Sequence, residues 1–185
     1  MSVTLRRIRE EDLEKILRWR MDPDITMYMN TNPKLTLEKQ KRWFAGIKEN
    51  RDVSYYMILV DGQEAGVLNL TGLTREDGVL GWAYYVGEKK LRSLKTAIVL
   101  EMGVYDYIFD QLGKKALISD VFTLNKGVIQ LHLLCGARIV EEKKNHVEKE
   151  GVFYDVTFME MTRERWESIR NTKKHDPLFF PKEEE

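Results

Sequence analysis

The sequence is poor in the residues and segments that mark secreted, membrane-spanning and metal-binding proteins. It contains one cysteine, Cys135, which cannot form an intrachain disulfide, and three scattered histidines, so we expect a reducing compartment and no metal site. No run of ~18 apolar residues is present, and the N-terminus has no apolar segment long enough for a signal peptide. These absences predict a cytoplasmic protein with no membrane partner.

Net charge is missing as well, because 30 basic side chains balance 30 acidic ones. A neutral chain gives no electrostatic support for nucleic acid as a partner. The 185 residues suffice for one well-packed domain, since domains commonly have ~100–200 residues. We assign this domain to residues 1–165 and a helix end with a tail to residues 166–185. In that tail, Phe179 and Phe180 either dock on the domain or leave the segment mobile.

Hydrophobic periodicity predicts alternating strands and helices along most of the chain. Strands are expected at residues 3–8, 53–73 (two strands joined at Asp61-Gly62), 78–87, 116–121, 138–140 and 152–161. Helices are expected at about residues 9–21, 36–47, 96–112 and 126–135, with a short one from residue 162. Residues 141–150 are expected to form a charged, solvated hairpin loop.

Residues 25–32 are expected to form a loop, because the preceding helix should end near Pro23. This loop is unusually rich in large, soft side chains. Met27, Tyr28 and Met29 either fill the core beneath a helical hairpin or line a pocket for a flat or apolar ligand.

The stretch from Ala116 to Val140 combines a strand, a turn, a helix and a return strand. Asn125 is expected to cap the helix, and Gly136 to end it in a left-handed conformation. Asp120 lies at the end of the strand and His132 on the helix, so we expect this junction to bring them together and to carry the chemistry. In the alternative interpretation, Asp120 caps the turn and His132 is a hydrogen-bonded histidine on a helix face.

The pattern N-x-x-x-I-x-L-H-x-x-x-G, read from Asn125 to Gly136, resembles the last helix of the GCN5-related N-acetyltransferases, N-x-x-A-x-x-L-Y-x-x-x-G-F. The resemblance implies two catalytic residues, with Asp120 as the general base and His132 as the general acid. His132 stands where Tyr is usual, and Ala137 where Phe is usual. An imidazole, with an unperturbed pKa of ~6.5, can give or take a proton near neutrality.

The order of predicted elements is also that of this superfamily. The resemblance implies an α/β (α+β) fold with a mixed central sheet of about seven strands and about four helices, splayed between strands 4 and 5. It also implies acetyl-CoA as the acyl donor.

The letters R-S-L-K-T-A, from Arg92 to Ala97, stand in place of the family's R/Q-x-x-G-x-G/A loop. The amides of that loop hold the coenzyme pyrophosphate at a helix start. Lys95 replaces the usual Gly, and it either adds charge attraction or fills the cradle with its bulk. The implied cofactor-binding residues are Tyr85, Val86, Arg92, Ser93, Leu94, Lys95, Thr96, Ala97 and Asn125.

The letters W-R-x-x-P-D-I, from Trp19 to Ile25, resemble the N-terminal segment of superfamily members that acetylate a UDP-linked 4-amino sugar in pseudaminic acid biosynthesis. The resemblance implies a small-molecule primary amine as the acceptor, and it admits a homodimer. The implied substrate-binding residues are Arg20, Tyr28, Met29 and Tyr84, with Arg20 contacting a phosphate or ribose. Alternatively, Arg20 forms a surface salt bridge.

Three functions therefore compete. The first is acetyl-CoA-dependent transfer of an acetyl group to the amine of a UDP-linked amino sugar. The second keeps the enzyme class but takes a polyamine, an amino acid or a protein N-terminus, and the lack of an acidic patch near Tyr28 argues against polycations. The third is a non-catalytic binding protein in which Lys95 closes the coenzyme loop.

Overall fold

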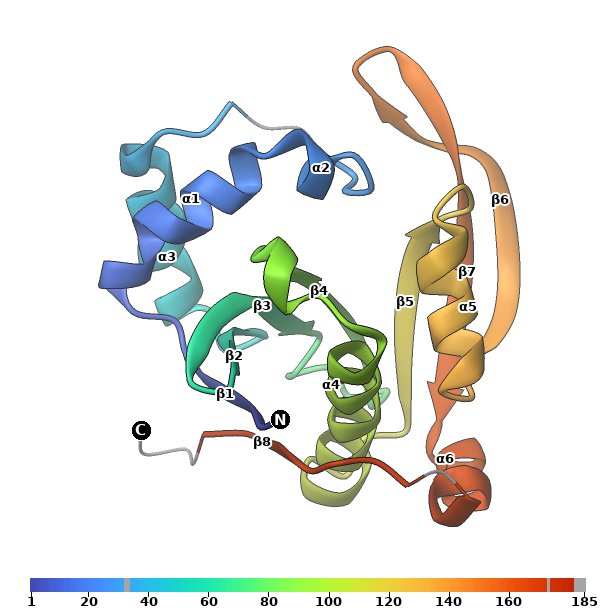
Figure 1. Ribbon diagram of the computed structural model, residues 1–185. Coiled ribbons are helices and arrows are strands. Elements are labelled where there is room, and N and C mark those ends of the chain that lie inside the picture. The colour runs from blue at the N-terminus through green and yellow to red at the C-terminus, as the bar shows by residue number, and fades with distance from the viewer. Residues whose placement is uncertain (32–33, 173, 182–185) are drawn as a thin grey trace.

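The structure is a computed structural model that describes residues 1–31, 34–172 and 174–181 (Figure 1). The end of the expected loop at Asn32 and the last residues of the expected tail, 182–185, lie outside the described residues. The strands are β1 (Val3–Arg7), β2 (Val53–Val60), β3 (Gln63–Thr71), β4 (Val79–Val86), β5 (Ala116–Phe122), β6 (Arg138–Lys149), β7 (Val152–Thr162) and β8 (Leu178–Phe179). The helices are α1 (Leu13–Met21), α2 (Pro23–Thr26), α3 (Leu37–Glu49), α4 (Leu94–Asp106), α5 (Lys126–Leu134) and α6 (Arg163–Ile169).

The described strands form one mixed sheet of eight, in the order β6-β7-β5-β4-β3-β2-β1-β8. Most neighbours are antiparallel, whereas β4 and β5 run parallel. Only Val79–Gly81 of β4 pair with Ala116–Ile118 of β5, so the two strands separate beyond that point. The predicted α/β fold, splayed between strands 4 and 5, is confirmed, and the strand beyond the expected seven is the short β8.

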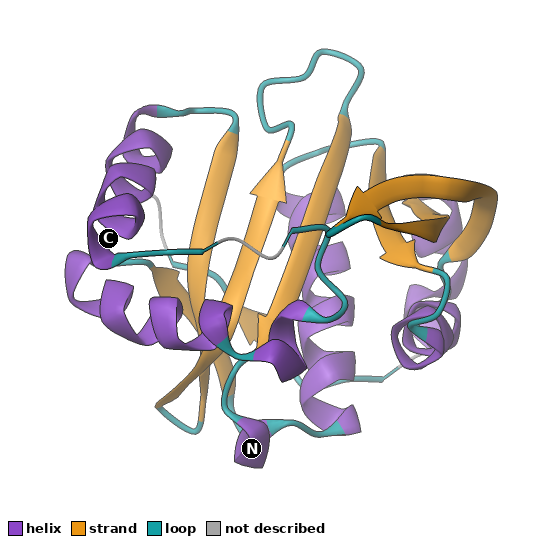
Figure 2. Ribbon diagram, turned by 90° about the horizontal axis from the view of Figure 1, so that it is seen from above, coloured by secondary structure: helices purple, strands orange, loops and turns teal. Residues whose placement is uncertain are grey.

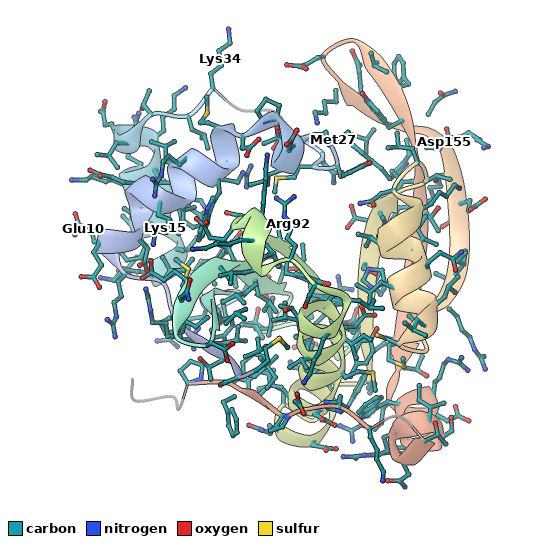
Figure 3. All side chains as sticks on the ribbon, viewed as in Figure 1. Glu10, Lys15, Met27, Lys34, Arg92 and Asp155 are labelled. Carbon is teal, nitrogen blue, oxygen red and sulfur yellow. The ribbon has the colours of Figure 1, made fainter. Side chains whose placement is uncertain are left out.

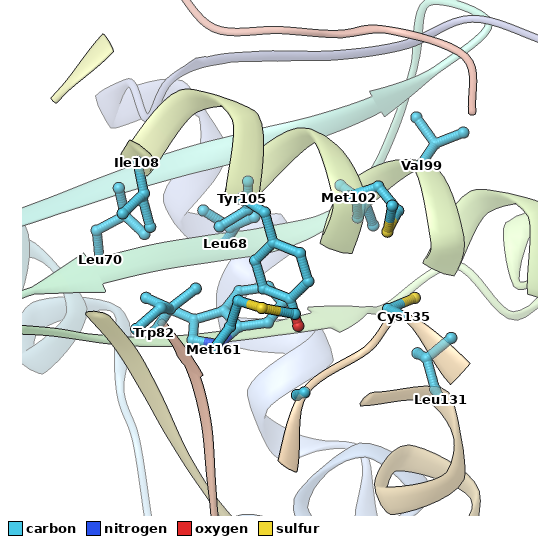
Figure 4. Close-up of a cluster of buried hydrophobic side chains, with 14 of the residues drawn as sticks. Leu68, Leu70, Trp82, Val99, Met102, Tyr105, Ile108, Leu131, Cys135 and Met161 are labelled. Carbon is cyan, nitrogen blue, oxygen red and sulfur yellow. The ribbon is translucent and has the colours of Figure 1, made fainter. Parts of the chain in front are cut away.

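Helices cover both faces of the sheet, as the view from above shows (Figure 2). One core cluster joins Trp82, Leu117 and Val121 of the sheet to residues of α4 and α5 such as Val99 and Ile129. Figure 4 shows part of this cluster, with Trp82 of β4, Val99 of α4 and Leu131 of α5 labelled. We call this side the α4–α5 face. A second cluster packs α1 and α3 on the opposite side, which we call the α1–α3 face.

Side-chain caps explain where three of the helices begin. Ser93 Oγ accepts from the amide of Thr96 at 3.0 Å, and Thr36 Oγ1 accepts from the amide of Lys39 at 3.3 Å. Asn125 Oδ1 accepts from the amide of Val128 at 3.5 Å, which confirms the predicted cap of α5. Gly136 follows that helix with a φ of 102°, a conformation that glycine adopts without steric cost.

Two expectations about local structure are wrong. Residues 141–150 are not a loop, because β6 runs from Arg138 to Lys149 along the edge of the sheet and pairs with β7. Its side chains are mostly exposed on both faces and its register shifts twice, so it lacks the alternation by which a strand is normally recognised. The loop expected at residues 25–32 begins inside a helix, because Pro23 ends α1 but also begins α2. Asp22 accepts from the amide of Asp24, and a proline suits the first helical position.

The C-terminal residues pack on the domain. Leu178 and Phe179 pair in parallel with Val3 and Thr4, and the ring of Phe180 stacks on Tyr107 at 3.6 Å between centroids. Trp166, at the start of the segment assigned to the tail, is fully buried in the α4–α5 core. Of the two phenylalanines, Phe180 is therefore the one that docks through its ring, while Phe179 stays exposed.

Among the described residues, no helix has both the length and the apolar character to cross a bilayer. The same residues contain no cluster of three or more His, Cys, Asp or Glu side chains arranged to hold a metal ion.

Gly66 provides a test of this strand arrangement, because it pairs with Val86 at the end of β4. A Cβ added at Gly66 would lie 1.9 Å from the backbone oxygen of Tyr85, so Gly66→Ala must push β4 away from β3. We expect a loss of ~2–4 kcal/mol in the free energy of unfolding, measured by urea denaturation. Gly46→Ala in α3, where an added Cβ meets no atom within 4 Å, is the control and should stabilise by ~0.5–1 kcal/mol. Equal stabilities of the two variants would contradict the close approach.

Candidate active site

The first part of the candidate site is the N-terminus of α4, which follows β4 on the α4–α5 face. Ser93 caps this helix with its own side chain. Among the described residues, the backbone amides of Leu94 and Lys95 have no acceptor, as expected for a first helical turn. These amides and the positive end of the helix dipole form a site that can hold an anion such as a phosphate.

The side chains of this loop leave the amides uncovered. Nζ of Lys95 lies 2.9 Å from Oδ2 of Asp176, so the lysine points to the C-terminal segment. Arg92 is exposed, and its Nε donates to the carbonyl oxygen of Val86 at 2.8 Å. Thr96 and Ala97 continue the helix, and Thr96 is buried. Of the predicted cofactor-binding residues, those from Tyr85 to Ala97 therefore lie between the end of β4 and the start of α4, whereas Asn125 caps α5. The Lys95 side chain does not fill the turn.

Asp120 lies beyond the splay on β5. Leu117 and Val121 of this strand belong to the α4–α5 core, so alternation directs Asp120 to the α1–α3 face. The carboxylate is exposed, and its Oδ2 accepts from Nδ2 of Asn30 at 3.1 Å. The loop after α2 is therefore in direct contact with the predicted general base.

The same loop also meets the long β6–β7 hairpin. Nζ of Lys149 donates to the carbonyl oxygen of Thr26 at 2.7 Å and lies 3.4 Å from that of Met27. Figure 3 shows Met27 at the end of α2 that faces this hairpin. Met27 and Tyr28 are exposed, whereas Met29 packs partly against the α1–α3 core. One side chain of the loop therefore supports the core, as one of the two interpretations predicted, and the other two are accessible to solvent.

His132 lies on the opposite side of the sheet, in the last turn of α5. It is 4% exposed, and its Nδ1 lies 2.8 Å from Oε1 of Glu101 in α4. Its ring also packs against Trp82 of β4 at 5.7 Å between centroids. The expectation that the strand–helix junction brings Asp120 and His132 into contact is not met, because successive residues of β5 face opposite ways and α5 covers only the α4–α5 face.

Tyr84 and Tyr85 are neighbours in β4 that point to opposite faces. Tyr84 stacks on Trp82 at 5.5 Å between centroids, and burial, with smaller contributions from Glu101 and Cys135, raises its pKa. Tyr85 packs edge-on against Trp19 of α1, and burial raises its pKa as well.

Two buried polar atoms lie close to the α1–α3 side of β4. Neither the hydroxyl of Tyr85 nor Nε of Arg20 has a hydrogen-bond partner among the described residues. The nearby guanidinium of Arg20 acts to lower the pKa of Tyr85, against the larger effect of burial. Such groups are normally satisfied in a folded protein. Arg20 and Tyr85 therefore can offer hydrogen bonds to a ligand on this side of the splay.

The sequence did not point to Glu101, Asn30 or Lys149. Glu101 interrupts a mostly apolar helix, and Tyr105 follows it one turn later. This spacing could have indicated a hydrogen-bonded pair on a buried helix face. Asn30 and Lys149 carry no local signal, because their partners are 90 and 123 residues away in the chain.

Known proteins resemble this chain in both sequence and fold. The profile of the family described as Acetyltransferase (GNAT) domain matches residues 2–138. The acetyltransferase PseH of Campylobacter jejuni is 22% identical over 138 residues, which cover 75% of this chain and 84% of that protein. A second PseH, from another strain of that organism, is 23% identical over the same length.

Solved structures share the architecture at low sequence identity. Spermidine N-acetyltransferase from Vibrio cholerae, in complex with CoA and spermine, has a TM-score of 0.82 and 16% identity, and the match covers 89% of this chain and 98% of that one. Aminoglycoside acetyltransferase AAC(6')-Ib in complex with coenzyme A has a TM-score of 0.74 and 19% identity, covering 91% and 99%. The family match extends through the splay, the start of α4 and all of α5, and on this ground the chain belongs to the GNAT family of acetyltransferases.

Proposed function

We propose that the chain transfers the acetyl group of acetyl-CoA to a primary amine, and that this amine belongs to a nucleotide-linked amino sugar. The observation that carries the proposal is that the two candidate proton-transfer residues lie on opposite faces of the sheet, at the place where β4 and β5 separate. Asp120 lies on the face of the α2 loop, and His132 lies on the face of α4. Asp120 is then on the side of the amine that must lose a proton, and His132 is on the side of the thiolate that must gain one.

The α4–α5 face suits the donor. The free amides of Leu94 and Lys95 and the positive end of α4 attract the negative pyrophosphate of coenzyme A. The pantetheine can then follow the unpaired edge of β4 into the gap, where strand-like hydrogen bonds are available beyond Gly81.

The α1–α3 face suits the acceptor. An alkyl ammonium has a pKa of ~10 and is mostly charged at neutral pH, so it must lose a proton before it can attack a thioester. Asp120, oriented by Asn30, accepts this proton directly or through water. The amine nitrogen then bonds to the acetyl carbon and releases its second proton to solvent. The carbon–sulfur bond breaks as the carbonyl re-forms, and His132 protonates the departing thiolate.

Charge favours a nucleotide-linked acceptor over a polyamine. Arg20 has a buried Nε without a partner among the described residues, and the ammonium of Lys149 lies beside the α2 loop. Cationic groups around the acceptor side attract a diphosphate and repel a polycation. The similarity to PseH supports the same choice, whereas the similarity to a spermidine N-acetyltransferase keeps polyamines as the second candidate.

Donor binding is tested by removing one amide. Leu94→Pro deletes an unpaired N–H at the first position of α4, where proline is favoured and where extended Ser93 can precede it. We expect acetyl-CoA affinity to fall ~10–100-fold in calorimetric titration, the value of one hydrogen bond to a charged group. Leu94→Ala keeps the amide and is the matched control, with an expected change of less than about threefold. Equal acetyl-CoA affinities for the two variants would contradict the binding of a phosphate at the start of α4.

The proton-transfer roles are tested by Asp120→Asn and His132→Phe. Each should lower kcat by ~10²–10⁴, because general acid–base catalysis contributes that much. Asp110→Asn and His146→Phe change the same residue types outside the gap and should stay within about threefold of the parent. Rates within a few-fold of the parent for both site variants would refute the assignment.

The acceptor is tested by mass detection of acetylated products from a UDP-linked 4-amino sugar, spermidine and kanamycin. We expect the nucleotide sugar to be the best substrate, and Arg20→Ala to raise its KM ~10–100-fold through the lost contact to phosphate. Arg18→Ala, an exposed arginine on the same helix, should leave KM within about threefold. Faster acetylation of spermidine, or equal KM values for the two arginine variants, would favour the second candidate.

A further inference from the structure

Glu101 is the one fully buried carboxylate in contact with His132, and its surroundings are unusual. It has 0% exposure in the middle of α4. Its Oε1 accepts from the hydroxyl of Tyr105 and lies 2.8 Å from Nδ1 of His132. Its Oε2 has no hydrogen-bond partner among the described residues.

The charge of this carboxylate has a single nearby counter-group. Among the described residues, His132 is the only side chain that forms an ion pair with Glu101. Burial raises the pKa values of Tyr84 and Tyr105, which therefore stay neutral and cannot compensate a negative charge, and Cys135, which also acts on both tyrosines, carries no positive charge in either of its protonation states. An uncompensated buried carboxylate is strongly disfavoured. Glu101 and His132 should therefore together hold one proton more than an ionised carboxylate beside a neutral imidazole.

That proton count fixes the other nitrogen of the imidazole. If Glu101 is ionised, His132 is an imidazolium, and both ring nitrogens carry hydrogen. If Glu101 is protonated, it donates to Nδ1, and a neutral His132 must then carry its hydrogen on Nε2. In both arrangements Nε2 is a donor.

We propose that Glu101 is the positioning residue that makes Nε2 of His132 the proton donor to the coenzyme A thiolate. The step rests on the proposed acetyl transfer. The Nε2–H bond breaks and an S–H bond forms, which leaves a neutral His132 with hydrogen on Nδ1 and an ionised Glu101. Solvent returns the proton when the product leaves. An unsupported neutral imidazole cannot do this, because loss of its only N–H proton would leave an anion.

Glu101→Gln removes the charge and keeps the shape. With acetyl-CoA and the UDP-linked 4-amino sugar, we expect kcat to fall roughly 10–100-fold, less than for loss of the acid itself, with KM for acetyl-CoA within about threefold. The alkaline limb of the plot of kcat against pH should move to lower pH, because the imidazolium loses its counter-charge. Glu101→Asp retains the charge and should keep that limb in place.

Tyr105→Phe is the matched control. It removes the other buried hydrogen bond to the same carboxylate oxygen, and it changes neither the charge of Glu101 nor the contact with His132. It should lower stability while leaving the alkaline limb where it is in the parent. If Glu101→Gln and Tyr105→Phe reduce kcat equally and neither moves the limb, Glu101 is structural and the proposal is overturned.

A measurement without substrate separates this proposal from the proposed function. Nitrogen NMR of the ligand-free protein, with His132 assigned by its loss in His132→Gln, should show Nε2 protonated at neutral pH and a changed pattern in Glu101→Gln. An unprotonated Nε2 in the parent refutes the positioning role whatever the enzyme acetylates. If Nε2 is protonated but no amine is acetylated, the proposed function fails and the proton-transfer step falls with it.

Discussion

Three residue pairs hold β4 and β5 together, and the candidate site begins where that pairing stops. Beyond Gly81 and Ile118, the facing edges of the two strands have N–H and C=O groups without strand partners in the described sheet. Each strand is held in place by its other neighbour, since β4 pairs with β3 over six residues and β5 with β7 over seven. Unpaired backbone groups are costly when buried, so this gap is suited to a ligand that supplies hydrogen bonds.

The gap also connects two chemically different sides. Alternation along β5 directs Asp120 to the α1–α3 face, while α5 and His132 cover the α4–α5 face. A reaction that takes a proton from one reactant and gives a proton to another needs separate groups for the two transfers. A sheet that is open between its central strands can provide them from opposite faces, without the two residues touching.

The proposed acceptor side is assembled from distant parts of the chain. The loop after α2 meets β5 through Asn30 and meets the β6–β7 hairpin through Lys149. The hairpin therefore has a structural role that its charged, mostly exposed sequence does not suggest. It supports the N-terminal loop from the far edge of the sheet, as the arrangement of α2 and the hairpin in Figure 1 illustrates.

Local signals in the sequence predicted most of the elements. The apolar alternation of residues 79–86, the cap at Asn125 and the turn at Gly136 act over a few residues, and each was confirmed. The continuation of β6 beyond residue 140 and the helix α2 were missed for physical reasons. An edge strand exposed on both faces has no hydrophobic period, and a proline that ends one helix can also start the next.

The sequence by itself predicted the order of strands and helices, the cap at Asn125 and, through the resemblance of its motifs, the acetyltransferase fold, because periodicity, capping and motif spacing are written in neighbouring positions. Only the tertiary structure decided which face each residue serves and which partner it meets. His132 finds Glu101 31 residues away, and Asp120 finds Asn30 90 residues away. Such pairs depend on how strands separate and helices pack, and the burial of Glu101 exists only after the chain has folded.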